Sequence, residues 1–435
     1  MPLSLSDVGQ RARRRIGRHL LPFLFILYVV AILDRVNVAY AALQMSHDLH
    51  FSDRVFGLGA GIFFFGYLLL EIPGALIVER WSARRWIARI LISWGLITVL
   101  IACVNTAREF YVARFLLGAA EAGFFPGIIV YLTHWFRFED RAKAVAIFMA
   151  AVPVSNIIGS PLSGLVLGVR WFGIQGWRWL FVLEGVPAIV LGAITLAYLT
   201  DWPRLASWLP KDECDWITDE LEREKQAKKA VRTFTIGQAL RQPVVIHLTL
   251  VYLLGSMGFY GFAIWFPTIL KRMSGLSDFH VGALASVAYV AAFVAMLANG
   301  WHSDLTSERR WHTAFPLLLA SAAFLALIPA RSHLLLEVAL LTCLGACVQA
   351  FYPTFWPIPT MLLGESAAAA SIGLINSVGG LGGFAGSYGV GYLANRTSSF
   401  SAGFAYLAVS VLLSALLLLS LRAHEPSKSA RQNHS

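Results

Sequence analysis

The chain alternates long apolar runs with short polar connections over most of its length. A helix needs about 20 apolar residues to cross a bilayer core of roughly 30 Å. Twelve runs of this kind are present, and each predicts a membrane-spanning helix. They cover residues 20–43, 55–78, 86–104, 110–133, 143–168, 177–199, 243–270, 280–300, 311–330, 333–362, 367–393 and 399–421. The first run is too long for a signal peptide and no small-residue cleavage site follows it, so we expect it to remain in the protein.

The composition supports this interpretation. Hydrophobic residues make up 57% of the 435 residues and charged residues 14%, whereas a soluble domain has about 25% charged residues. The four cysteines follow neither a disulfide framework nor a zinc pattern. We therefore expect an all-α integral membrane protein that works within the lipid bilayer, without a metal or another cofactor and without nucleic acid as a partner.

The net charge is +10, and the distribution of the basic residues along the chain indicates on which side of the membrane each loop lies. An even number of spans puts both termini on one side of the membrane. Of the 35 Lys and Arg residues, 25 then fall on the terminal side, 8 on the opposite side and 2 within spans. Cytoplasmic loops carry the excess of positive charge. We therefore expect a multi-pass protein of the inner (plasma) membrane with both termini in the cytoplasm.

The only long polar segment between spans, residues 200–242, divides the chain into residues 1–199 and 243–435. Its mixed charges at helical spacing predict a solvated interfacial helix in a cytoplasmic linker. The two halves repeat weakly: Glu79 and Asp304 end corresponding spans, and Asn156 and Asn376 begin similar segments. Parallel repeats of six spans predict two six-helix bundles around a central cavity, an arrangement suited to alternating access.

Charged residues within the spans are the strongest functional signal. Each costs at least about 2.5–3.5 kcal/mol at the centre of a helix in a bilayer. At 1.5 Å of rise per residue, Asp34 lies about 13 Å deep and Glu121 about 16 Å deep. Arg114 precedes Glu121 by two helical turns and shares its face. Arg35 follows Asp34 directly.

Two interpretations of these four residues remain open. In the functional one, Arg35 and Arg114 bind a carboxylate, which matches the planar guanidinium, while Asp34 and Glu121 exchange protons. In the structural one, Arg114 pairs with Glu121 and Asp34 with Arg35, and the pairs only hold helices together. Buried ion pairs stabilise poorly, which favours the functional interpretation.

Other polar residues in the spans admit similar alternatives. We expect structural pairing or gating for Glu71, pairing with Arg178 for Glu184, and a structural role for Glu337 near the outer edge. Five residues at midplane depth are candidates for a substrate site or for helix packing: Tyr67, Asn156, Gln349, Trp356 and Asn376. The prolines of the tenth span, which flank Trp356, predict a bend.

Two loop sequences resemble the Gly-xxx-Asp-Arg-x-Gly-Arg-Arg motif of the major facilitator superfamily. The loop between spans eight and nine keeps its Gly300, Asp304, Arg309 and Arg310. The loop between spans two and three is degraded, with Glu79 in place of the Asp before Arg80, and Ser82 in place of a Gly before Arg84. The resemblance implies the major facilitator fold and a conformational, gating role for these loops.

Within that superfamily the chain resembles the anion:cation symporter family, in its tartrate and sugar-acid branch. The specific segments are Asp34–Asn37, Arg114–Pro126 and Gly176–Phe181. The resemblance implies proton coupling by Asp34 and Glu121, and substrate binding by Arg35 and Arg114 together with Tyr67, Trp356 and Asn376. The family has small hydroxyl residues before the Trp of span ten, whereas this chain has Pro353 and Phe355, which leaves room for a shorter or more aromatic carboxylate.

The sequence thus predicts a proton-coupled symporter for a small organic anion such as tartrate, an aldonate or an aldarate, which functions as a monomer. Sodium coupling remains an alternative, because Asp and Asn clusters bind Na⁺, and so does an aromatic acid as the substrate. Multidrug efflux and a non-transporting anion sensor are weaker alternatives. An enzyme is not expected, since no metalloprotease motif and no phosphate loop is present.

Overall fold

The computed structural model describes residues 5–229, 242–330, 333–363 and 365–421, and this part of the chain is helical without strands. The first half contains α1 (Leu5–Asp48), α2 (Asp53–Arg80), α3 (Ala83–Ile101), α4 (Ala107–Glu121), α5 (Phe124–Thr133), α6 (Phe138–Met149), α7 (Ala151–Leu167) and α8 (Gly176–Tyr198). The connecting segment forms α9 (Lys211–Lys229). The second half contains α11 (Pro243–Ser274), α12 (Asp278–Thr306), α13 (Arg310–Ala326), α14 (Leu334–Phe355), α15 (Pro357–Leu362), α16 (Glu365–Thr397) and α17 (Ser401–Ser420).

Each of the twelve predicted spans coincides with one helix or with two consecutive helices. Within the described residues, nine helical stretches are long and apolar enough to cross a membrane by length and composition. Three spans are broken in two, as α4 and α5, α6 and α7, and α14 and α15. The last break lies between Pro353 and Pro359 and provides the bend that the prolines predict.

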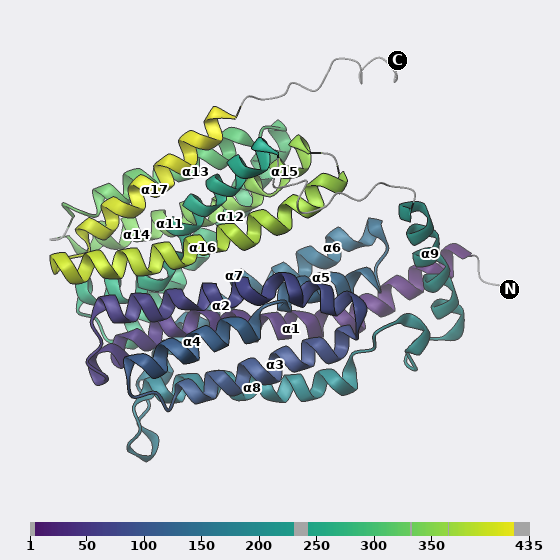
Figure 1. The fold of residues 1–435 in the computed structure, drawn as a ribbon, viewed down its shortest axis with the longest axis horizontal. Coiled ribbons are helices and arrows are strands. Elements are labelled where there is room, and N and C mark those ends of the chain that lie inside the picture. The colour runs from purple at the N-terminus through teal and green to yellow at the C-terminus, as the bar shows by residue number, and fades with distance from the viewer. Residues whose placement is uncertain (1–4, 230–241, 331–332, 364, 422–435) are drawn as a thin grey trace.

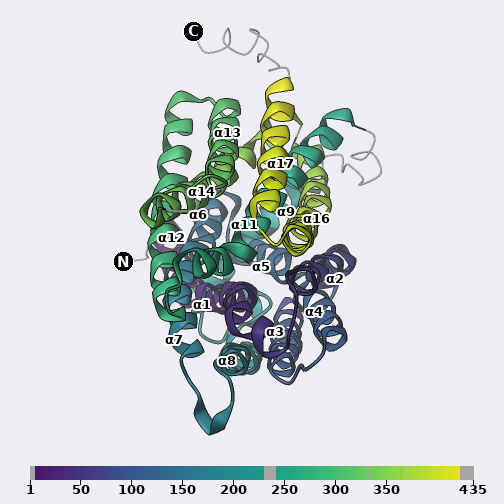
Figure 2. The ribbon, with the colours of Figure 1, turned by 90° about the vertical axis from the view of Figure 1, so that its left-hand side faces the viewer.

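The helices form two groups that lie side by side (Figures 1 and 2). We call α1–α8 the N bundle and α11–α17 the C bundle. Three pairs of helices join them: α2 with α16, α7 with α12, and α1 with α11. The two bundles approach closely at the left-hand end of Figure 1 and diverge toward the right-hand end, where α9 lies.

The bundles are held together at the end farthest from α9. The Asp53 carboxylate accepts hydrogen bonds of 2.8 and 2.5 Å from both terminal nitrogens of Arg272. Gln44 donates to Asp278 across the same interface at 2.8 Å. The backbones also approach closely here, since a Cβ at Gly57 would lie 2.7 Å from the Ser387 carbonyl oxygen. This end of the interface is therefore closed by direct helix contact.

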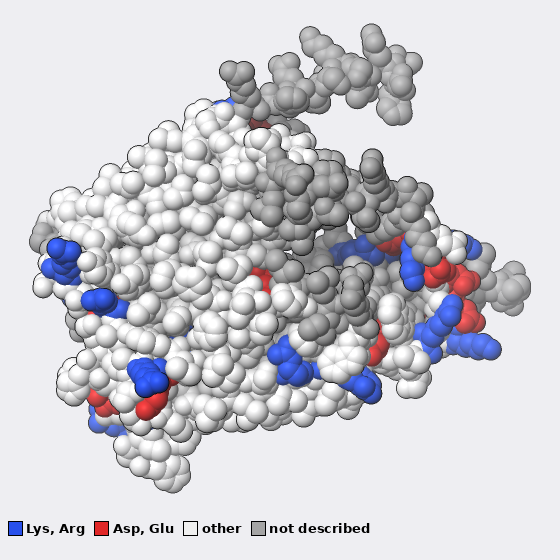
Figure 3. Space-filling view, viewed as in Figure 1, with Lys and Arg blue, Asp and Glu red and all other residues white. Residues whose placement is uncertain are grey.

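Charge is concentrated at the two ends of the molecule. Figure 3 shows most Lys, Arg, Asp and Glu side chains of this face near its left-hand and right-hand ends, with a largely uncharged belt between them that contains one acidic patch. Many large apolar side chains of the helices are exposed, for example Leu100, Val294 and Phe315, which are 61%, 59% and 61% exposed. A surface of this kind is suited to contact with lipid rather than water.

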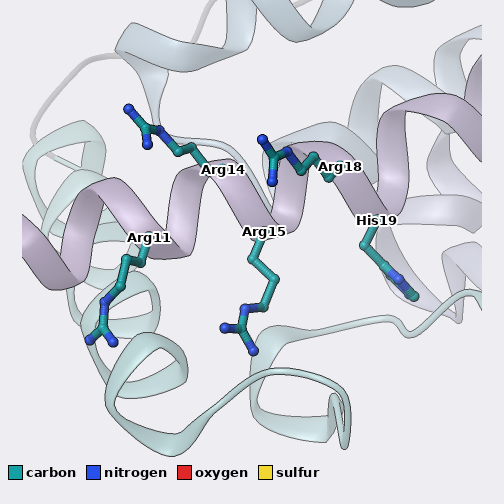
Figure 4. A pocket seen from close by; sticks show the side chains of 5 residues that line it. All are labelled: Arg11, Arg14, Arg15, Arg18 and His19. Carbon is teal, nitrogen blue, oxygen red and sulfur yellow. The ribbon is translucent and has the colours of Figure 1, made fainter.

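The linker helix α9 is present, but one face of it packs against the N bundle rather than lying free in solvent. Ile217 of α9 is buried, and Arg15 of α1 pairs with the buried Glu213 at 3.2 Å. Arg141, in the first turns of α6, pairs with Glu224 at 3.0 Å. Four arginines and His19 of α1 line a cavity of about 440 Å³ beside this contact. Figure 4 shows Arg11, Arg15 and His19 on one side of α1, and Arg14 and Arg18 on the other.

We expect Gly57→Leu to open the closed end, because no side chain fits between α2 and the Ser387 carbonyl. Overpacking of this kind costs about 1–3 kcal/mol. A cysteine at the buried position Ser387, in a chain without other cysteines, should then react at least about five times faster with a maleimide added from that side. Gly380→Leu, where a Cβ would meet no atom within 4 Å, is the matched control. Equal labelling rates for the two variants would contradict the close contact.

Candidate functional site

The centre of the molecule contains an ion pair between Arg35 of α1 and Glu121 of α4. The Arg35 Nη2 and Nε donate to the same oxygen, Glu121 Oε1, at 2.5 and 3.1 Å. The two side chains differ in exposure, because Arg35 is 27% exposed and Glu121 only 2%. The Arg35 guanidinium therefore retains accessible surface in the middle of the protein, whereas the Glu121 carboxylate is fully buried. The second oxygen of Glu121 has no hydrogen-bond partner among the described residues.

A break in the fourth span sets the position of Glu121. The predicted continuous helix ends at Glu121 and restarts at Phe124, and between them Gly123 adopts a φ of +83°. This left-handed conformation suits glycine because glycine has no Cβ. Glu121 is thus the last residue of α4, where it meets the middle of α1.

Aromatic rings surround the Arg35 guanidinium. The rings of Tyr67 and Phe63, both on α2, have their centroids 5.5 and 5.9 Å from Arg35 Cζ. Tyr28 of α1 and Tyr260 of α11 lie within electrostatic range. Aromatic rings stabilise a cation through their π-electrons. Tyr260 was not predicted from the sequence, although its place in the seventh span put it at similar depth.

Arg114 also contacts Phe63, with its Cζ 4.9 Å from the ring centroid. It is only 2% exposed, and its one hydrogen bond with the described residues is a long one, 3.4 Å, to the Ala60 carbonyl oxygen. The Nε and Nη1 donors have no partner in the described part of the chain. The pairing of Arg114 with Glu121 that the structural interpretation supposes is not seen, because Arg35 occupies Glu121. The cluster retains buried donors that an anion could use.

Asp34 and Arg35 bond different partners, so the pair of neighbours in the structural interpretation is also not seen. Its carboxylate accepts from Thr98 Oγ1 of α3 at 3.0 Å and from Asn37 Nδ2 at 3.1 Å. The side chain is 1% exposed, and no salt bridge to it occurs among the described residues. Consecutive residues of a helix point about 100° apart, which separates the acid and the base.

Glu71 of α2 connects the two bundles. Its two carboxylate oxygens accept hydrogen bonds from Asn376 Nδ2 at 2.7 Å and from Ser377 Oγ at 2.8 Å, both on α16. Asn376, a candidate substrate residue, is thus engaged by an acid from the other bundle. Among the described residues, these are the only side-chain hydrogen bonds between α2 and α16.

The remaining candidates from the sequence are more scattered. Asn156 of α7 donates to the Val152 carbonyl oxygen of its own helix, and no bond of the partly buried Gln349 is among those described. Trp356 packs on Tyr252 of α11, with ring centroids 4.9 Å apart. The structure therefore brings Tyr67 together with Arg35, Arg114 and Glu121. The Asn156 side chain instead bonds within its own helix.

The loop between α2 and α3 is organised by a residue that sequence reasoning missed. Asp201, just after α8, accepts from the backbone amide of Arg84 at 2.9 Å and from Ser82 Oγ at 2.7 Å. Ser82 in turn caps α3. A carboxylate at a helix N-terminus is stabilised by the free amide groups there. The side chains of Glu79 and Arg80 lie outside the described residues.

The loop between α12 and α13 is held by its own residues. Arg309 pairs with Asp304 and donates to Ser303 Oγ at 3.0 Å. A Cβ at Gly300 would lie 3.5 Å from Pro353, which is an ordinary contact distance. The Asp304–Arg309 pair therefore fixes a tight connection between the two helices, whereas Gly300 meets no steric requirement here.

Comparison with known proteins identifies the family. The family model of the Major Facilitator Superfamily matches residues 24–387. The chain belongs to this superfamily. It is therefore a membrane transporter with the twelve-helix fold of two six-helix bundles, as the sequence predicts.

Individual relatives cover nearly the whole chain. A protein of Agrobacterium vitis that is named as a tartrate transporter is 44% identical over 98% of both chains. A protein of Acinetobacter baumannii named as a quinolone resistance transporter is 36% identical, over 94% of this chain and 95% of that one. A bacterial homologue of the human lysosomal transporter Spinster, solved in an inward-facing and unoccupied conformation, superposes with a TM-score of 0.74 at 18% identity, over 94% and 95% of the chains.

We expect Glu71 and Asn376 to be energetically coupled. Removing either partner leaves a buried polar group unsatisfied, which costs about 1–3 kcal/mol. Glu71→Ala and Asn376→Ala should each lower the melting temperature of the purified protein, and the double variant should lose less than the sum. Glu71→Ala combined with Asn156→Ala is the control pair, because Asn156 bonds only within its own helix. Additive losses in both pairs would exclude the bridge between bundles.

Proposed function

We propose that this transporter moves a small organic dianion, such as tartrate, together with protons into the cell. The observation that carries the proposal is the partly exposed Arg35 guanidinium, paired with a sealed Glu121 at the centre of the two bundles. A relative that is 44% identical over 98% of both chains is named as a tartrate transporter, and this supports the substrate class.

The pair explains how a proton and an anion become linked. While Glu121 is ionised, it occupies the Arg35 donors. A proton on Glu121 removes its charge and weakens the charge-assisted hydrogen bonds. The planar fork of Arg35 is then free to bind a substrate carboxylate through two parallel bonds. Anion binding and protonation of Glu121 therefore favour one another, and the loaded carrier holds both.

Arg114 supplies the second cationic group. It shares the Phe63 ring with Arg35, and its Nε and Nη1 are available as donors. Two guanidiniums against the two carboxylates of a dianion give a neutral arrangement. The empty cluster of Asp34, Arg35, Arg114 and Glu121 is neutral as well. Because uncompensated charge in a low-dielectric interior is costly, a dianion favours the binding of about two protons, which we assign to Asp34 and Glu121.

Polar and aromatic residues nearby complete the proposed substrate site. We assign substrate contact to Tyr67 beside Arg35, to Trp356 and Gln349 from the C bundle, and to Asn376 once it leaves Glu71. Asn156 is assigned a packing role at the same level, because it bonds its own helix. Release of Asn376 by Glu71 would couple substrate binding to the movement of one bundle against the other.

We propose an inner-membrane orientation with both termini in the cytoplasm, supported by the count of 25 basic residues on the terminal side against 8 on the other. The closed end then faces outward. In this arrangement the bundles 1–199 and 243–435 rotate relative to each other around the substrate site. The linker 200–242 moves with the N bundle, because α9 packs against that bundle. We propose that the loops around Arg84 with Asp201, and around Asp304 with Arg309, restrain this motion and that the monomer suffices for transport.

Export of an aromatic compound is the second candidate. The 36% identical relative named as a quinolone resistance transporter favours it. So does the aromatic lining near Trp356, which packs against Tyr252 and Phe355 with centroid distances of 4.9 and 5.4 Å. Transport of an aromatic acid would use the same guanidiniums, whereas an aromatic cation would be repelled by them.

We expect proteoliposomes containing the purified protein to accumulate radiolabelled tartrate against its gradient when the outside is acidic. Glu121→Gln should lose this accumulation by about tenfold or more, because Gln takes up no proton, yet keep tartrate exchange across the membrane. Glu109→Gln is the matched control, since Glu109 is an exposed residue at the start of the same helix.

Three other results would redirect the assignment. Full accumulation by Glu121→Gln would remove Glu121 from coupling. Accumulation driven by a sodium gradient alone would replace the proton by Na⁺. Transport of an aromatic acid, but not of tartrate, would favour the second candidate.

A further inference from the structure

Glu184, in the middle of the sixth span, is a buried acid without the partner that the sequence predicts. It lies on α8 and is only 8% exposed. The expected partner, Arg178, donates instead to the carbonyl oxygens of Ala102 and Val104 at 2.6 and 3.2 Å, and to Asn105 Oδ1 at 2.8 Å. The Oε2 atom of Glu184 has no hydrogen-bond partner among the described residues.

The neighbours of Glu184 are the residues that hold Asp34. The Glu184 carboxyl group faces the side-chain amide of Asn37 and lies within electrostatic range of Asp34. The amide also faces Asp34, to which its Nδ2 donates at 3.1 Å. Its Oδ1 is buried and has no partner in the described part of the chain. Asn37 thus lies between two carboxyl groups, with one donor in use and one acceptor free.

Few charges reach this place. The helices packed against α8 are α1, α3 and α7. From α1 only Asp34 faces Glu184 with a charge, and α3 contributes the neutral Thr98 hydroxyl, which is bonded to Asp34. The described residues of α7 carry no charged side chain. Two buried carboxyl groups without a cation in contact cannot both be ionised at moderate energy, so they must share protons.

We propose that Asp34, Asn37 and Glu184 form one proton-holding site, in which Glu184 stores a proton that it shares with Asp34. With Asp34 ionised, the Asn37 Nδ2 donates to it, and the protonated Glu184 can donate its O–H to the free Asn37 Oδ1. In the alternative state the shared proton resides on Asp34, and the ionised Glu184 accepts from the Asn37 amide, so the total charge of the site is unchanged. The transport consequence, but not the proton sharing itself, rests on the proposed function.

This site is separate from the anion site. Asp34 is directed toward α3 and α8, whereas Arg35 is directed toward Glu121 and the rings of α2. Glu121 and Arg114 of α4 act on Asp34 through their charges, but neither forms a salt bridge with it among the described residues, so a bound carboxylate does not take the place of the stored proton. The Asp34–Glu184 site can therefore carry the second proton of the pair that a dianion requires, while Glu121 carries the first.

Infrared spectroscopy of the purified protein tests the sharing without any substrate. Protonated carboxyl groups have a C=O stretch that ionised ones lack. Around neutral pH we expect a protonated-carboxyl band that is absent in Glu184→Gln. In Asp34→Asn the same band should titrate at a different pH, because the charge that faces Glu184 is gone. Glu337→Gln, which removes a buried acid in the C bundle, should leave this band unchanged.

Two results would overturn the proposal. One is a Glu184→Gln spectrum with all protonated-carboxyl bands of the unmodified protein. The other is a Glu184 band whose titration is the same with and without Asp34. If Glu184→Gln does not fold, Asp34→Asn alone still decides between shared and independent protons.

Transport measurements then test the consequence. In proteoliposomes that accumulate tartrate, Glu184→Gln should shift the pH at which accumulation is half-maximal, because Asp34 then loses the acid with which it shares its proton, while tartrate exchange continues. An unchanged pH dependence would remove Glu184 from coupling even if it shares a proton. Absence of tartrate transport in the unmodified protein would count against the proposed function and leave the infrared result standing.

Discussion

The interior of this protein depends on one constraint: hydrocarbon does not solvate charge, so a charged side chain within a span must be compensated by the protein. Most stretches of the spans meet this constraint because they contain no charged residue, which leaves a belt of largely uncharged surface. Most exceptions lie on α1, α2, α4 and α8, and they are Asp34, Arg35, Glu71, Arg114, Glu121 and Glu184. Their arrangement follows from the number of partners available. Arg35 and Glu121 satisfy each other, Asp34 takes a hydroxyl and an amide, and Arg114 and Glu184 retain unsatisfied atoms.

The same centre connects charge to the packing of the bundles. At the closed end, α2 and α16 approach closely at Gly57, and the Asp53–Arg272 pair spans the interface. Toward the other end the contact changes from backbone packing to a polar bridge, in which Glu71 holds Asn376 and Ser377. A polar bridge exchanges its partners at lower cost than an interlocked backbone contact, because water or a ligand can replace each hydrogen bond. The interface is therefore rigid at one end and adaptable beside the site.

The sequence predicts well how deep a side chain lies in the membrane, but it predicts poorly toward which neighbouring helix the side chain points. Run lengths place twelve spans, and a rise of 1.5 Å per residue puts Asp34 and Glu121 at the same level. Partner choice depends instead on the rotation of each helix and on local breaks, which the apolar pattern does not encode. The left-handed Gly123 ends α4 at Glu121, so this acid meets Arg35 of α1 and not Arg114 of its own helix. The partner of Glu184 was predicted wrongly and Asp201 was missed for the same reason, since their contacts come from segments far away in the sequence.

The incomplete pairing is what makes the centre suitable for transport. A fully satisfied network of two acids and two guanidiniums would gain nothing from an anion and would bind it weakly. Here one guanidinium is held by a single carboxylate oxygen and the other lacks a carboxylate in contact. An arriving anion can therefore improve the hydrogen bonding of both, provided that protons neutralise the acids it displaces. The unsatisfied hydrogen-bonding groups of the empty site thus favour the joint binding of an anion and protons. This function accounts for the presence of buried charges with poor partners in the membrane interior.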